Sequence, residues 1–145
     1  MDPITAIVTA LIAGATLAAG DVGKEAVGDL YAGGKQAIVD AYTGLKALIV
    51  GRFGADSDVV DAVEGVEKRP DSDGRKSTLT EEAELAKLQN DKEIVAAAEK
   101  LMTLLKETPA GEKMAQNIQS AVGSYIAQAQ GPGANASVNV NKPDK

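Results

Sequence analysis

The residue types that carry most enzyme chemistry are scarce in this chain. It contains no His and no Cys, which removes the usual general base near neutral pH, the thiolate nucleophile and the two commonest transition-metal ligands. Catalysis would have to rely on carboxylates, Lys, Tyr or Ser, and none of these stands in a recognisable catalytic spacing. We therefore expect no catalytic, cofactor-binding or metal-binding residue, and a protein that is not an enzyme.

The C-terminal tail holds the side chains best suited to repeated hydrogen bonding between copies. Residues 130–141 read QGPGANASVNVN, and their last residues alternate Val with Asn as a strand does. A side-chain amide both donates and accepts, so copies stacked in register can form ladders along a fibril, with valines in the dry face. The candidates are Gln128, Gln130, Asn135, Asn139 and Asn141 for the ladders, with Val138 and Val140 between the sheets. The alternative is a disordered terminus.

The N-terminal segment is the second unusual element, because residues 4–19, ITAIVTALIAGATLAA, carry no charge. Asp2 can accept the free amide protons of a first turn and Pro3 suits the first helical position, so a helix begins there. It would extend about 24 Å, against about 30 Å of hydrocarbon in a bilayer. Such a helix either enters a membrane or lies buried on all sides at the centre of a bundle. We favour burial of the helix in the resting protein. Burial and membrane entry are compatible if activation releases the helix.

The rest of the chain predicts an all-α helical bundle of about five to six helices with no internal sheet. After the first helix, the apolar spacing indicates helices from Asp21 to Gly51–Gly54, over Asp56–Val66, from Asp71 or Ser72 with Leu79, Leu85 and Leu88 facing inward, from Asp91, and from Thr108-Pro109. We expect Tyr31 and Tyr42 in the core. The predicted bundle covers residues 1–128, with the apolar helix in 1–20, and a flexible or amyloid-prone tail covers 129–145.

The composition indicates what kind of core the protein has and which classes of binding partner it lacks. Aromatic residues make up 3% of the chain and Trp is absent, so the core must consist of small aliphatic side chains packed closely. The net charge of −6 gives no broad positive field for a phosphate backbone, which argues against nucleic-acid binding. The pairs Lys68-Arg69 and Arg75-Lys76 are expected on a solvated face. The first basic residue is Lys24, which argues against a secretory signal and favours a cytoplasmic protein.

Three stretches together resemble a known family. MDPITAIVTALIAGA, DLYAGGKQAIVDAYTGLKALIVGRFG and VEGVEKRPDSDGRKSTLTEEAE are similar to the Bell domain, a bacterial relative of the HeLo-type helical cell-death domains of fungi. The resemblance covers roughly residues 1–107. It implies an effector whose first helix attacks the membrane, a role that falls on Ile4, Ile7, Val8, Leu11, Ile12 and Leu17. It also implies a tail that templates on a matching motif, with Gly133, Asn135 and Val138 as matching positions.

The resulting hypothesis is an effector of regulated cell death or anti-phage immunity. A sensor, in such systems a nucleotide-binding oligomerisation receptor with a matching motif, would nucleate stacking of the tail. The assembled bundles would then form homo-oligomers and permeabilise the membrane through the first helix, so that the protein is cytoplasmic at rest and bound to membrane lipids on activation. The alternatives are a non-toxic adaptor that binds protein partners, and a scaffold that assembles through the bundle itself.

Overall fold

The described part of the chain is all-helical, as the apolar spacing predicts. The computed structural model describes residues 2–19, 35–107 and 109–130, and no strand occurs within these ranges. The elements are α1 (Pro3–Ala19), α3 (Lys35–Phe53), α4 (Asp58–Lys68), α5 (Asp73–Ala86), the short 3₁₀ turn η1 (Leu88–Asn90), α6 (Lys92–Leu105) and α7 (Pro109–Gln130). The predicted all-α fold class is therefore confirmed.

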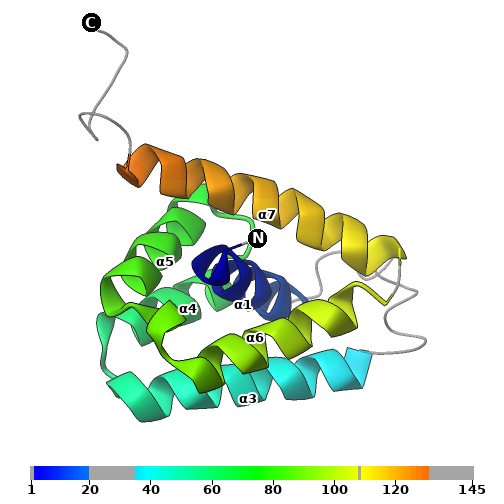
Figure 1. The fold of residues 1–145 in the computed structure, drawn as a ribbon, viewed down its shortest axis with the longest axis horizontal. Helices are drawn as coiled ribbons and strands as arrows, with labels where there is room; N and C mark the ends of the chain where they lie inside the picture. The colour runs from blue at the N-terminus through cyan, green and yellow to red at the C-terminus, as the bar shows by residue number, and fades with distance from the viewer. Residues whose placement is uncertain (1, 20–34, 108, 131–145) are drawn as a thin grey trace, which may run out of the picture.

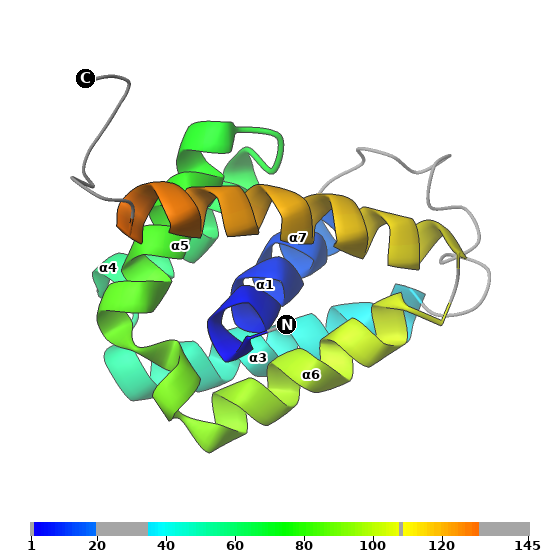
Figure 2. The same ribbon diagram turned by 45° about the horizontal axis from the view of Figure 1, so that its top comes forward.

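Helix α1 lies at the centre of the bundle. Figures 1 and 2 show α7 on one side of it and α3 and α6 on the other, while α4 and α5 close one end. α1 contacts α3, α4, α5, η1, α6 and α7, which are all the other elements that the structure describes. The helix without charges is thus the one around which the rest of the bundle packs.

The helices begin at side chains that satisfy free backbone amides. Asp2 Oδ1 accepts from the Thr5 amide at 2.9 Å, which starts α1 where the sequence predicts. Ser72 and Asp91 cap α5 and α6, also as predicted. α4 differs slightly, because Ser57 accepts from the Val60 amide and the helix begins at Asp58, two residues after the predicted start.

Two backbone reversals set where α3 and α5 end. Gly54 has a φ of +96°, a left-handed conformation that glycine adopts without strain, and it follows the last residue of α3. Lys87 has a φ of 58° and ends α5 before Leu88. Leu88 therefore belongs to η1 rather than to the predicted fourth helix, although it is buried as expected.

The expectation that Leu85 faces inward is wrong. Its side chain is 68% exposed, and the inward face of α5 is formed by Leu79, Thr80 and Ala83. Leu85 lies six residues after Leu79, which at about 100° per residue places it on the far side of the helix. Leu88 reaches the core only because the turn at Lys87 redirects the chain.

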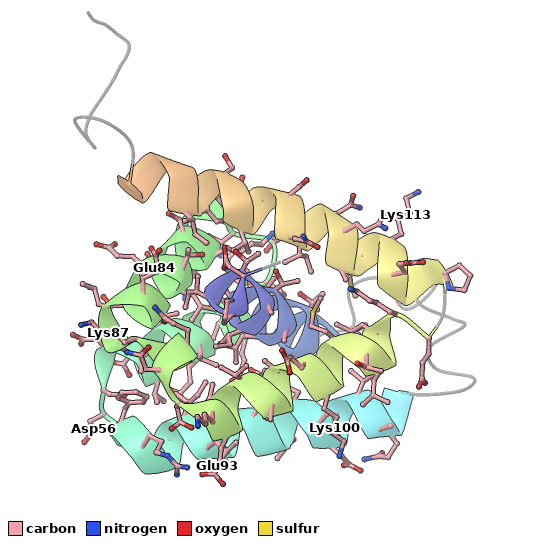
Figure 3. The ribbon with its side chains drawn as sticks, in the orientation of Figure 1. Asp56, Glu84, Lys87, Glu93, Lys100 and Lys113 are labelled. Atoms are coloured by element: carbon pink, nitrogen blue, oxygen red, sulfur yellow. The ribbon has the colours of Figure 1, made fainter. Side chains whose placement is uncertain are left out.

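The core is made of small aliphatic side chains, as the composition requires. The apolar spacing places Val59, Val60, Val63 and Val66 inward on α4, and all four are buried. On α6 the buried residues are Ile94, Ala98, Leu101, Met102 and Leu105, as the spacing predicts, whereas Val95 of the same stripe is half-buried. Tyr42 is 4% exposed, which confirms its place in the core. Charged side chains point outward from the bundle, as Figure 3 shows for Glu93, Lys100 and Lys113. Gly33-Gly34, Tyr31 and the remainder of residues 20–34 lie outside the described residues.

The boundary predicted between bundle and tail falls inside a helix. α7 continues to Gln130, so the backbone at Gln128 and Gln130 is helical. The other candidate assembly residues, which lie within 131–141, are outside the described residues.

Candidate functional site

The candidate membrane residues of α1 are all buried within the bundle. The exposed fraction does not exceed 9% for any of Ile4, Ile7, Val8, Leu11, Ile12 and Leu17. Among the described residues, no helix has both the length and the apolar character needed to cross a membrane. The structure therefore buries these six side chains in the bundle, the arrangement that the sequence favours for the resting protein.

At Gly14 the backbone of α1 lies against the side chain of Tyr42 of α3. A Cβ atom at this position would lie 2.4 Å from Tyr42 Cδ1, 2.8 Å from Cγ and 3.0 Å from Cβ. No side chain fits there unless the two helices move apart, because the last of these atoms is fixed to the backbone of α3. Gly14 therefore allows the Tyr42 ring to lie directly on the backbone of α1.

Tyr42 is held in this position by a polar cluster between α3 and α4. Its hydroxyl donates to Glu67 Oε2 at 2.5 Å, and Lys46 Nζ donates to both carboxylate oxygens of Glu67 at 3.0 Å. Burial, followed by the hydrogen bond to Glu67 and its charge, raises the pKa of Tyr42 well above its ordinary range. The phenol therefore stays protonated and keeps donating. We call Gly14, Tyr42, Lys46 and Glu67 the α1 clasp.

One edge of α1 reaches the surface at Ala6. This half-buried residue lines a groove of about 220 Å³ together with Glu99, Met102, Thr103 and Lys106 of α6. A larger side chain at Ala6 can enter the groove instead of the core. Ala6 is therefore a position at which α1 can be substituted without leaving a cavity in the core or overpacking it.

α7 covers α1 and packs on the core through small fully buried side chains, with Met114, Ile118 and Ile126 partly buried beside them. Its fully buried side chains are Ala115 and Val122, and none of the largest fully buried side chains among the described residues comes from α7. Tyr125 also donates to Asp73 Oδ1 of α5 at 3.2 Å. Burial, the charge of Asp73 and this hydrogen bond raise the pKa of the Tyr125 phenol. α7 thus covers α1, and its last residue, Gln130, directly precedes the rest of the tail.

The two basic pairs of the sequence lie at the surface of the bundle. Lys68, Arg69 and Arg75 are exposed and Lys76 is half-buried, which agrees with a solvated face, and Arg75 Nη1 donates to the Gly65 carbonyl at 3.2 Å. The described residues hold no group of three or more acidic side chains arranged to bind a metal ion.

Sequence reasoning placed Tyr42 in the core but missed its partners. Tyr42 and Lys46 share one face of α3 because they are four residues apart. That spacing was an available signal. Glu67 lies 25 residues from Tyr42 in the chain, and only the packing of α4 on α3 brings it there.

Comparison with known protein families relates the whole chain to one of them. The model of the Het-E N-terminal domain matches residues 1–145, the whole of this chain. The chain belongs to the Het-E N-terminal domain family. This is a HeLo-like domain related to fungal cell death, and it is associated with effectors of cell death and incompatibility. No curated protein and no solved structure matches the chain. The match confirms the HeLo-like relationship that the sequence suggested; the narrower assignment to the Bell domain stays a prediction.

Proposed function

We propose that this Het-E N-terminal domain is a cell-death effector that stores a membrane-active helix inside a bundle and releases it on activation. The observation that carries the proposal is the enclosure of α1, the helix without a charged residue, at the centre of the bundle. A helix on the surface of a globular protein has one apolar face and one charged face, whereas a helix that is apolar all round lies in a core or in a membrane. A helix that is apolar around its whole circumference suits lipid as well as protein.

The length of α1 limits how it would act in a bilayer. Its 17 residues extend about 26 Å at 1.5 Å per residue, about 4 Å less than the hydrocarbon core. A short helix is accommodated by local thinning of the bilayer, at a fraction of a kcal/mol per Å. Local thinning by several copies would make the membrane permeable.

The arrangement of α7 supports a route from the tail to α1. α7 covers α1 and ends at Gln130, where the candidate assembly segment begins. In the proposal, a sensor or a second copy nucleates stacking of the tail, and the gathered copies exchange the contacts between α7 and α1 for contacts with one another. The protein would be cytoplasmic before this step and bound to membrane lipids after it.

The groove at Ala6 gives a test that leaves the bundle intact. Ala6→Glu places a carboxylate in the groove, where Lys106 lies on the facing wall. A charged side chain at the centre of a helix in a bilayer costs about 2.5–3.5 kcal/mol. Ala6 lies five residues, about 7.5 Å, from the centre of α1, so the same carboxylate there costs a fraction of this. Thr103→Glu on α6 is the matched control, because it adds the same charge to the other wall of the same groove.

Dye release from phosphatidylethanolamine and phosphatidylglycerol vesicles would be measured for the full chain and both variants, after circular dichroism has shown equal helix content. We expect release by the natural chain and by Thr103→Glu, and reduced release with Ala6→Glu. Equal release by all three would refute membrane entry by α1. Absence of release from every folded chain, also after seeding with preassembled tail, would favour the adaptor.

A further inference from the structure

The polar side chains of α1 lie in one stripe. They are Thr5, Thr9 and Thr16, and every other residue of the helix is Ala, Ile, Val, Leu, Gly or Pro. At about 100° per residue the three threonines fall within a sector of about 40°. Gly14, which faces Tyr42 of α3, lies on the opposite side of the helix. The threonine stripe is therefore separate from the surface that the α1 clasp holds.

Thr9 stands out because its hydroxyl is unused. Its side chain is completely buried, and its Oγ1 atom has no hydrogen-bond partner. The hydroxyl of Thr16 donates to the Ile12 carbonyl at 2.8 Å, the usual arrangement for a threonine in a helix. The hydroxyls of Thr78, Thr80 and Thr103 bond in the same way. A buried polar group without a partner destabilises the resting bundle, so the packing of the bundle does not explain a threonine here.

We propose that the threonine stripe is the face through which released copies of α1 pair with one another in the membrane. A hydroxyl both donates and accepts, so the stripe on one copy complements the stripe on a second copy. Threonine is also among the residues that join helices in lipid, where water does not compete for the hydrogen bond. This inference rests on the proposed function, because it assigns a role to one side of the helix that the proposal releases.

The remaining surface of α1 fits this arrangement. Ile4, Ile7, Val8 and Leu11 form a second sector, centred about 130° from the threonine stripe, whereas Ile12 lies about 40° from the centre of the stripe and would pack within the pair. In a pair or ring of copies joined through threonines, the large apolar side chains of the second sector face the lipid. The bundle uses them as core at rest, whereas the Thr9 hydroxyl gains a partner only in the assembly.

The absence of cysteine from the chain allows a direct test. Single substitutions Thr9→Cys, Ala10→Cys and Ala15→Cys introduce one thiol each into the full chain. All three positions are buried at rest, and the two alanines lie about 100–120° from the stripe on either side of it. Each protein would be warmed with phosphatidylethanolamine and phosphatidylglycerol vesicles to just below its unfolding midpoint and then oxidised with copper phenanthroline.

We expect Thr9→Cys to form disulfide-linked dimers several-fold more than either alanine variant, and only when vesicles are present. Equal crosslinking at Ala10→Cys or Ala15→Cys, in chains that do release dye, would overturn the pairing face and leave the proposed function standing. Chains that neither bind the vesicles nor release dye would overturn the proposed function and the pairing face together.

Thr9→Val adds an independent measurement, because valine has nearly the same shape as threonine and lacks the hydroxyl. The inference predicts a higher urea midpoint for the resting bundle together with slower dye release. A lower midpoint would show that the hydroxyl is satisfied at rest and would remove the reason for assigning it a second role.

Discussion

The contact between Gly14 and Tyr42 makes a quantitative prediction about how α1 is retained. In Gly14→Ala, the new methyl group would lie 2.4 Å from Tyr42 Cδ1, which is 1.0 Å (3.4 − 2.4) inside the distance at which ordinary contact begins. The ring cannot turn aside freely, because its hydroxyl is bonded to Glu67 and its Cβ atom is also at 3.0 Å. α1 and α3 must therefore separate.

The magnitude follows from two opposing effects. Overpacking of a core costs about 1–3 kcal/mol, and replacing Gly by Ala within a helix returns about 1 kcal/mol. The matched control is Gly44→Ala in α3, where a Cβ atom would have no neighbour within 4 Å. We expect Gly44→Ala to raise the free energy of unfolding by about 0.5–1 kcal/mol, and Gly14→Ala to lie about 1–3 kcal/mol below it.

Urea unfolding followed by circular dichroism measures both variants on one scale. If Gly14→Ala stabilises the protein as much as Gly44→Ala does, then α1 is not held against Tyr42 and the account of the α1 clasp is wrong. If Gly14→Ala is instead less stable than Gly44→Ala, as we expect, its dye release should also begin at a lower temperature than release by the natural chain.

Three further predictions concern the bundle. Tyr42→Phe should lower the free energy of unfolding by about 1–2 kcal/mol in urea, because it removes a hydrogen bond to a charged group. The pKa of Tyr42 is higher in the folded than in the unfolded protein, so its contribution is fully present below about pH 10 and is lost as the pH rises further; Tyr42→Phe should flatten that loss. Asp91→Ala should cost about 0.5–2 kcal/mol, since it removes the cap of α6, and a change below that range in thermal unfolding would contradict the cap. Leu11→Ala should cost about 2–5 kcal/mol, whereas Leu85→Ala should stay within about 0.5 kcal/mol, and equal effects would contradict the burial described.

Local signals in the sequence predicted much of this fold. The caps at Ser72 and Asp91 and the apolar stripes of α4 and α6 depend on residues three or four positions apart, and each was found where expected. Leu85 was misplaced because it lies six residues after Leu79, on the far side of α5, and Leu88 reaches the core only because the left-handed residue Lys87 redirects the chain. Features that join distant residues were not predictable. The bond from Tyr42 to Glu67 and the unpaired hydroxyl of Thr9 arise from how the helices pack, which no local spacing encodes.

The central claim is that α1 leaves the bundle and enters the bilayer. The most direct test is to measure the membrane entry of α1 and of its neighbour α6 separately. Ala6→Cys and Thr103→Cys place a fluorophore on opposite walls of one groove, the first on α1 and the second on α6. Each labelled chain would be added to vesicles containing brominated lipids, which quench a fluorophore that enters the hydrocarbon. If α1 leaves the bundle for the membrane, the label at residue 6 is quenched on activation and the label at residue 103 is not. Vesicles that leak while the label at residue 6 stays unquenched would contradict the account.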